Sequence, residues 1–403
     1  MKYSKQEVIQ YVQEEDVKFI RLAFCDVFGK QKNISIMPEE LPRAFEYGIA
    51  IDASAIKGFG DETHSDLLLH PEADTLMPLP WRPEHGRVVR MFCNISYPDG
   101  KIFECDSRSI LKQAIQDAKK AGCQFFFGAE QEFYLFTLDD NGNPTKKPYD
   151  NAGYMDIAPE DRGENIRREI CLTLEQMGIR PESSHHEEGP GQNEIDFRYS
   201  SPLTAADNAM TFQTVVKTIA HRNGLYADFS PKPLKDKPGN GFHINMSVKS
   251  SDDTDYMNFM IAGILAKVAD MTIFLNPLKN SYQRFGNNKA PKYISWSSEN
   301  RSQLVRVPAA IGEYKRAELR SPDPAANTYL AFALMIYASL YGIQNRLALP
   351  ASTDINLYKA DTETLAKFEQ LPDNFKSACA IASCSDFIRE HIPDTILDIY
   401  CNR

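Results

Sequence analysis

Apolar residues recur along this chain with two different periods, which predicts a mixture of strands and helices. Alternating or continuous β-prone runs predict strands over residues 17–24, 32–36, 124–137, 192–199, 241–247, 303–308 and 314–320. Apolar residues at helical spacing predict helices over residues 164–178, 203–223, 255–275 and 325–346. Because no unit repeats at a fixed period, this mixed order of elements indicates an α+β fold.

Two domains are expected, because 403 residues exceed what one hydrophobic core usually holds. A turn-rich stretch at residues 97–100 is followed by Asp106, which begins a clean helical pattern that ends before Gly122. We therefore place the boundary near residue 103. A short-stranded N-terminal domain is predicted over residues 1–103, and a larger domain over residues 104–403.

The charge and apolarity of the chain exclude several classes of partner. A net charge of -10 gives no broad electrostatic reason to bind nucleic acid or anionic lipid. The most apolar stretches, residues 257–275 and 329–343, are interrupted by charges or too short to span a bilayer, so we expect buried helices and no membrane partner. The N-terminus carries no export signal and the cysteines form no C-x-x-C pair, which favours a cytoplasmic protein with reduced thiols.

Glu130 and Glu132 lie in an aromatic, β-prone run, G-A-E-Q-E-F-Y. Side chains two residues apart share one face of a strand, so the two carboxylates are expected about 7 Å apart. An exposed charged face is one interpretation. The surrounding aromatic residues instead indicate a covered sheet, where unpaired carboxylates are expensive to desolvate and cations would offset their charge.

Two further segments carry ligand-type residues. In H-H-E-E-G-P-G-Q-N-E, a glycine-proline-glycine turn can fold Glu187 and Glu194 onto one site, although an acidic surface loop fits the segment equally well. A glycine-rich stretch, P-G-N-G-F-H, then leads to His243. Taken alone, such a histidine is more often structural than a metal ligand.

Arginines crowd around Glu318 near the end of the strand pattern: Arg301, Arg306, Arg316 and Arg320. A surface ladder of ion pairs is one interpretation, and clamping of phosphate and carboxylate groups is the other. Carboxylates with one imidazole are hard ligands that suit Mg²⁺ or Mn²⁺. Two such metals beside several arginines are typical of a phosphoryl-transfer site.

These motifs, in this order along nearly the whole chain, resemble the bacterial type I glutamine synthetase family. The pattern is G-x-E-x-E, H-H-E with G-Q-N-E, K-P-L-x3-P-G-N-G-x-H-x3-S, N-x-x-N-R-S and R-x-E-x-R-x-P-D. FIRLAFCDVFGKQKNISI also resembles the β-grasp unit of that family. The resemblance implies an N-terminal β-grasp domain and a larger catalytic α+β domain with a curved antiparallel sheet.

The resemblance also implies roles for individual residues. The implied metal ligands are Glu132, Glu187 and Glu194 for one ion and Glu130, His243 and Glu318 for the other. The implied nucleotide-binding residues are Arg301, Arg306 and Arg316 at the phosphates and Ser247 near the adenine. The implied substrate-binding residues are Glu132, Gly239, Arg284 and Arg320, of which Arg284 and Arg320 also count as catalytic.

The activity implied by the resemblance is ATP-dependent formation of glutamine from glutamate and ammonium through γ-glutamyl phosphate, with two Mg²⁺ or Mn²⁺ ions per site. Asp52 would reach the site of a neighbouring subunit and act on ammonium. Active sites formed between subunits imply a homo-oligomer, either a hexameric ring or a stacked dodecamer.

One departure from the family pattern concerns the acceptor amine. Lys289 stands in the flap segment N-S-Y-Q-R-F-G-N-N-K-A-P where the family has a glutamate that helps to deprotonate ammonium. A γ-glutamyl ligase that uses a polyamine, ethanolamine or an alkylamine is therefore an alternative. A non-catalytic regulatory relative is a third hypothesis, which the complete set of metal positions and arginines disfavours.

Overall fold

The computed structural model describes residues 3–82, 85–287, 289–310 and 312–403, and the chain divides into two compact units. The first unit comprises Met1–Lys112 and Gln176–Gly178, and the second comprises Gln113–Glu175 and Ile179–Arg403. Helix α3 (Ser107–Lys120) continues from one unit into the other. The predicted boundary at residue 103 stays a prediction.

The first unit is built on a six-stranded sheet with the order β2-β1-β6-β4-β3, in which β5 also pairs with β6. Its strands are β1 (Val17–Cys25), β2 (Gln31–Ile36), β3 (Ile49–Asp52), β4 (Asp66–Pro71), β5 (Met77–Pro78) and β6 (Arg87–Ser96). Its helices are α1 (Lys5–Glu14), α2 (Leu41–Tyr47) and the 3-10 turns η1 (Pro38–Glu40) and η2 (Ala73–Thr75). The antiparallel pairing of β1 with β2 confirms the predicted strand pair.

The second unit is built on a nine-stranded sheet with the order β13-β14-β15-β12-β7-β10-β9, in which β8 and β11 also pair with β7. All of its named pairings are antiparallel except that of β13 with β14. The strands are β7 (Cys123–Leu138), β8 (Pro144–Pro148), β9 (Pro181–His186), β10 (Gln192–Phe197), β11 (Leu225–Asp228), β12 (Phe242–Ser250), β13 (Trp296–Ser298), β14 (Val305–Val307) and β15 (Ala317–Leu319).

The longer helices of this unit fall where the apolar spacing predicts them. They are α4 (Glu164–Gln176), α5 (Pro202–Arg222), α6 (Met257–Leu275) and α7 (Thr328–Gln344), followed by the shorter α8 (Thr362–Leu365), α9 (Phe375–Cys384), α10 (Asp386–His391) and α11 (Asp394–Cys401). The 3-10 turns are η3 (Ser281–Gln283) and η4 (Gly312–Tyr314). Strands β14 and β15, which lie between β13 and β12, are shorter than predicted, and β14 ends before Pro308, which lacks the N–H that a longer ladder requires.

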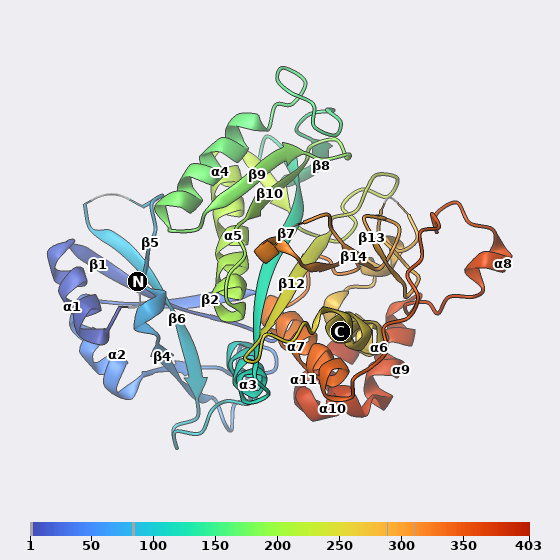
Figure 1. Cartoon of the computed structure of the whole chain (residues 1–403). Helices are drawn as coiled ribbons and strands as arrows, with labels where there is room; N and C mark the ends of the chain where they lie inside the picture. The colour runs from blue at the N-terminus through green and yellow to red at the C-terminus, as the bar shows by residue number, and fades with distance from the viewer. Residues whose placement is uncertain (1–2, 83–84, 288, 311) are drawn as a thin grey trace. The chain divides into compact units, whose positions relative to one another are not determined.

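The two faces of β7 carry different residues. Figure 1 shows β7 and β12 side by side in the second unit. Phe127 stacks on Phe332 of α7 with ring centroids 4.2 Å apart, and Phe133 contacts Phe212 of α5 at 6.2 Å. The side chains that alternate with Phe127 and Phe133 along β7 point to the opposite face of the sheet. One face of the sheet is therefore the apolar core, and the opposite face is free to carry polar groups.

Helices α6 and α7 cross at two glycines. A Cβ atom on Gly342 would lie 2.0 Å from the carbonyl oxygen of Phe259, and one on Gly263 would lie 2.1 Å from that of Ala338. Helix α6 is long and apolar enough to cross a membrane by length and composition alone, but 67% of its most apolar stretch is buried. Both apolar helices are thus core helices, as the sequence predicts.

Gly342→Ala is expected to destabilise the protein. The added methyl group has to push two helix backbones apart, and overpacking of this kind costs about 1–3 kcal/mol. At a helix position with free space around it, the same change would stabilise the protein, because alanine has a higher helix propensity than glycine. Urea denaturation measures the difference. Gln344→Ala, on the exposed side of the same helix, is the control, and a Gly342→Ala variant as stable as the unchanged protein would contradict the close crossing.

Candidate active site

The strand register gathers the acidic residues on the polar face of the second unit's sheet. Glu194 on β10 lies opposite Glu132 on β7, and His243 on β12 lies opposite Glu130. Directly opposite residues of antiparallel strands have Cβ atoms about 4.5–5.5 Å apart. Strand pairing alone therefore brings these side chains together, and no loop is needed to position them.

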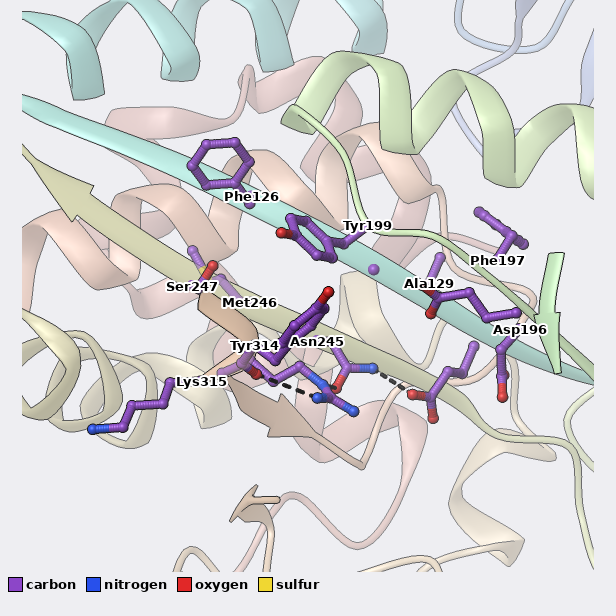
Figure 2. Close-up of a pocket in the computed structure, with 14 residues that line it drawn as sticks. Phe126, Ala129, Asp196, Phe197, Tyr199, Asn245, Met246, Ser247, Tyr314 and Lys315 are labelled. Atoms are coloured by element: carbon purple, nitrogen blue, oxygen red, sulfur yellow. Dashed lines mark hydrogen bonds between the residues drawn. The ribbon is translucent and has the colours of Figure 1, made fainter. Parts of the chain in front are cut away.

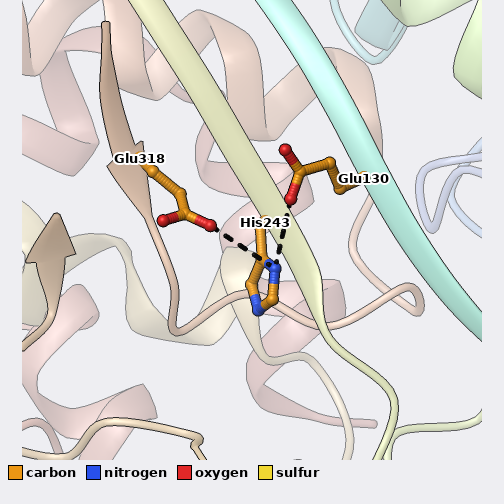
Figure 3. Close-up of side chains that lie close together, drawn as sticks. All are labelled: Glu130, His243 and Glu318. Atoms are coloured by element: carbon orange, nitrogen blue, oxygen red, sulfur yellow. Dashed lines mark ion pairs between the residues drawn. The ribbon is translucent and has the colours of Figure 1, made fainter. Parts of the chain in front are cut away.

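A first cluster consists of Glu130, His243 and Glu318. His243 Nδ1 lies 3.4 Å from a carboxylate oxygen of Glu130 and 3.6 Å from one of Glu318 (Figure 3). Ligand atoms from all three residues lie within 4.8 Å of one another, as divalent metal coordination requires. The grouping is the same as the second metal set that the resemblance implies.

Two arginines hold Glu318 in its charged form. Its side chain is 1% exposed, and it accepts hydrogen bonds from Arg306 Nε and from Arg320 at 2.8 Å. Burial opposes ionisation, but Arg320, His243 and Arg306 together lower the pKa of Glu318 to about 2. This cluster thus keeps an anionic carboxylate even where solvent is excluded.

The second cluster brings together more carboxylates than the first. Ligand atoms of Glu132, Glu194 and His243 lie within 4.8 Å of one another, and so do those of His185, Glu187 and Glu194. Glu132, Glu187 and Glu194 do not form one such group among the described residues. Glu194 is instead shared among three groups, the third with Glu130 and Asp196. His185 Nε2 lies 3.8 Å from Glu194 and 3.7 Å from Glu187.

Burial and mutual repulsion shift the acids of this second cluster. Burial, reinforced by Glu132, raises the pKa of Glu187 to about 8. Burial and the charge of Asp196 raise the pKa of Glu194 well above its ordinary value. Carboxylates in this position require either protons or cations. A divalent cation fits this oxygen-rich donor set, so the residues present suit a metal.

The hairpin that carries Glu187 and Glu194 is anchored by a buried histidine. His186 is fully buried, and its ring nitrogens lie 2.9 Å from Asp150 and 2.7 Å from the carbonyl oxygen of Glu187. Asp150 also accepts a hydrogen bond from the backbone N–H of Gly191 in the turn. Burial opposes protonation of His186, but these acceptors raise its pKa, and the buried ring ties the turn between the two glutamates to Asp150.

The glycine-rich segment before His243 contacts Glu132 and Arg284. Gln192 Nε2 and the backbone N–H of Gly241 donate to Glu132 at 2.8 and 2.9 Å. A Cβ atom on Gly239 would lie 2.7 Å from Cγ of Arg284 and 2.5 Å from a backbone oxygen. Only glycine leaves room at this position for the buried arginine.

These groups surround a cavity of about 240 Å³. Its wall includes Glu130, Glu132, His185, Glu187, Glu188, Glu194, Asp196, Gly239, His243, Arg284, Lys289, Arg301, Arg306, Arg316 and Arg320. Arg284 is 3% exposed and donates to the carbonyl oxygen of Ser321 at 2.9 Å. The cavity therefore combines a carboxylate-rich floor with arginines that suit anionic substrates.

A second, smaller pocket of about 90 Å³ continues along the same sheet face. Figure 2 shows that Phe126, Tyr199, Met246 and Tyr314 line this pocket, with Ser247 next to Met246. Its other end shares Glu130, Asp196 and Arg316 with the larger cavity. An aromatic pocket that opens onto arginines and carboxylates suits a planar base joined to a phosphate chain.

Asn245 joins the two pockets. Its side-chain nitrogen donates to Glu130 at 2.6 Å, and its side-chain oxygen accepts from Arg316 Nε at 2.7 Å. Sequence reasoning missed Asn245, as well as Asp196 and His185. The period-two rule could have found Asn245 and Asp196, because each lies two residues beyond a predicted ligand, His243 or Glu194.

Asp52, the remaining predicted site residue, belongs to the first unit. It is exposed at the end of β3, and Ser54 donates to it from its backbone and hydroxyl groups at 3.0 and 2.7 Å. These hydrogen bonds lower the pKa of Asp52. The roles of all the predicted site residues stay predictions.

Comparison with known proteins identifies the family. The model described as "Glutamine synthetase, catalytic domain" matches residues 104–403, and "Glutamine synthetase, beta-Grasp domain" matches residues 16–98. The chain belongs to the glutamine synthetase family. The resemblance and the predicted fold, a β-grasp domain followed by a catalytic domain with a curved antiparallel sheet, are thereby confirmed.

Individual relatives of the glutamine synthetase family match almost the full length of the chain. Glutamine synthetases of Clostridium saccharobutylicum and Methanosarcina mazei are each 43% identical, covering 99% and 98% of this chain and 94% and 92% of their own. A solved structure of a GmaS/ADP complex aligns with a TM-score of 0.88 at 25% identity, covering 98% of this chain and 94% of that one. Membership of the family implies an enzyme that uses ATP and a divalent metal.

The metal-free protein is expected to lose stability as the pH rises from about 5 to about 8. Folding raises the pKa of Glu187 to about 8, so between its unfolded and folded pKa values the folded state binds the extra proton. Glu187→Gln removes this term and should be more stable than the unchanged protein at pH 8 by at least about 1 kcal/mol.

Urea denaturation in a chelator at several pH values tests this, with the exposed Glu175→Gln as the control. The advantage of Glu187→Gln should shrink towards pH 5 and disappear when Mg²⁺ or Mn²⁺ is added. An advantage that is constant with pH would contradict the shifted carboxylate.

Proposed function

We propose that this protein is an ATP-dependent ligase that forms glutamine from glutamate and ammonium. The observation that carries the proposal is the single cavity in which two carboxylate clusters face buried arginines and open onto an aromatic pocket. Relatives named glutamine synthetase at 38–43% identity support the same reaction.

We assign two divalent metals, Mg²⁺ or Mn²⁺, to the two clusters. Glu130, His243 and Glu318 would hold one ion, and Glu132, Glu187 and Glu194 the other. When bound, these ions neutralise the phosphate oxygens of ATP and the charge that develops during phosphoryl transfer. The raised pKa values of Glu187 and Glu194 support a cation beside them.

ATP would bind across the two pockets, with its adenine near Ser247 and its phosphates facing Arg301, Arg306 and Arg316. The neighbouring structure of a GmaS/ADP complex supports a nucleotide in this fold. Glutamate would bind beside Gly239 and Glu132, with its carboxylates facing Arg284 and Arg320. A buried, planar guanidinium pairs well with a carboxylate, and both side chains are at most 3% exposed.

The reaction then follows two steps. The γ-carboxylate of glutamate attacks the γ-phosphorus of ATP and releases ADP, and Arg320 stabilises the transferred phosphoryl group. Ammonia next attacks the acyl carbon of γ-glutamyl phosphate, and inorganic phosphate leaves. The positions of Arg284 and Arg320 hold the reacting carboxylate in place, which is the main contribution that a protein makes to phosphoryl transfer.

A second candidate, a γ-glutamyl ligase for an organic amine, follows from the flap, which lacks the glutamate that ammonium use implies at the position of Lys289. Lys289 lines the cavity and brings a positive charge to its wall, where the family resemblance implies an acidic residue. The reaction up to γ-glutamyl phosphate is the same in both candidates. Only the nucleophile in the second step differs.

Removing a ligand from the first cluster should abolish the first step. Glu130→Ala and Glu318→Ala are expected to reduce glutamate-dependent ADP release by at least about a hundredfold, because each loses charge at the phosphoryl group. The exposed Glu175→Ala serves as the control. Near-normal ADP release in either variant, in the presence of Mg²⁺ or Mn²⁺, would refute the metal assignment.

We further propose that Asp52 completes the site of a neighbouring subunit, where it would bind and deprotonate ammonium. This arrangement implies a homo-oligomer, a hexameric ring or a stacked dodecamer. A cytoplasmic location is part of the same proposal, which the eight free cysteines support.

Mixed oligomers test the shared site. Asp52→Ala and Glu130→Ala subunits should each be inactive alone, but when co-expressed they should recover about a quarter of the activity, because some interfaces then combine two unchanged halves. Separately purified variants mixed without reassembly are the control. Recovery in a monomeric preparation, or none in co-assembled rings, would contradict the shared site.

A further inference from the structure

Lys289 has a defined place at the wall of the cavity. A tight turn holds it, with the N–H of Gly286 donating to the carbonyl oxygen of Ala290 at 2.8 Å. Its own carbonyl oxygen accepts from Arg320 at 3.5 Å, so the backbone of the turn contacts one of the buried arginines. The side chain is 43% exposed and therefore lies between the interior of the cavity and solvent.

Two groups from elsewhere in the second unit receive the ammonium group of Lys289. It forms an ion pair with Glu188, in the turn after β9, and it lies 5.1 Å from the ring centroid of Tyr154. Tyr154 in turn contacts the ring of His185 at 5.4 Å, and His185 faces Glu187 and Glu194. The lysine side chain thus contacts two residues of the cavity wall beside the second cluster.

A carboxylate and an aromatic face together recognise alkylammonium groups. In this protein Glu188 and Tyr154 form such a site, and an alkylammonium from the protein itself, that of Lys289, fills it. The same two groups are therefore unavailable to an external amine. Under the proposed function the acyl carbon lies beside Arg320, which contacts the backbone of Lys289, so an alkyl substituent on the attacking nitrogen would point towards this half-exposed part of the wall.

We propose that Lys289 determines acceptor size: by filling the site between Glu188 and Tyr154, it admits ammonium and excludes amines with an alkyl substituent. This inference rests on the proposed function and refines its second step. A methyl group placed there would meet a charged, hydrated side chain, and one methylene group in a specificity pocket alters discrimination by roughly 10–200-fold.

The experiment measures kcat/KM for ammonium and for methylamine from glutamate-dependent ADP release. The unchanged protein should prefer ammonium. Lys289→Ala empties the site and leaves Glu188 unpaired, so the ratio of methylamine to ammonium should rise by at least about tenfold. An unchanged ratio would overturn the inference, and so would an unchanged protein that uses methylamine as well as ammonium.

Two further variants separate size from charge. Lys289→Met keeps most of the volume and should keep the ratio within about threefold of the unchanged protein. A rise as large as that of Lys289→Ala would overturn the role of size. The double variant Glu188→Gln with Lys289→Ala should lose the gain in methylamine use, since the carboxylate that receives the amine is gone, and a full gain would overturn the role of Glu188.

The same assay distinguishes this inference from the function on which it rests. No glutamate-dependent ADP release with any acceptor would refute the proposed function and this inference with it. If ADP release depends on glutamate, but Lys289→Ala has the same ratio of methylamine to ammonium use as the unchanged protein, only the inference is refuted. A Lys289→Ala protein that releases ADP but uses no acceptor would also refute it, because the lysine would then serve the reaction itself.

Discussion

The alternation of side chains along β7 is the constraint on which the site depends. One set of residues, with Phe127 and Phe133, packs against α5 and α7, while Glu130 and Glu132 point to the opposite face. A shift of one residue would turn the carboxylates into the apolar core. The packing of the aromatic rings therefore sets the position of the acids, so that core stability and site geometry come from the same strand.

The two clusters solve the problem of buried charge in different ways. Arginines of the protein pair with Glu318 and keep its pKa low, so this carboxylate stays ionised without a bound cation. Glu187 and Glu194 form no ion pair with an arginine among the described residues, and burial together with neighbouring carboxylates raises their pKa values. The second cluster depends more strongly on a cation, and protons compete with that cation at neutral pH.

Much of this arrangement could be predicted from sequence because it follows local rules. The shared face of Glu130 and Glu132 follows from a period of two, and the long apolar helices follow from their spacing. The acidic turn and the lone histidine stayed ambiguous, because local pattern does not report which strands become neighbours. That information came from the family resemblance, and the register of β10, β7 and β12 then supplied the geometry.

Other features depend on contacts between distant segments and could not be read from any one of them. The pair of Lys289 with Glu188 joins the flap to the turn after β9, and His185 enters the second cluster only because β9 pairs with β10. Glu132, Glu187 and Glu194 share a predicted ion, yet the structure distributes them over three groups. The positions of these side chains depend on both packing and charge interactions between segments that are distant in sequence.

Asn245 gives the site a thermodynamic property that neither pocket has alone. One amide contacts both a carboxylate of the first cluster and the arginine that borders the aromatic pocket. An ion that fixed Glu130 would also fix the amide, and the amide would then hold Arg316 in place for a phosphate chain. Under the proposed function, occupancy of either pocket would lower the entropy cost of ordering the other, and because such coupling is reciprocal, metal and nucleotide would each raise the affinity for the other.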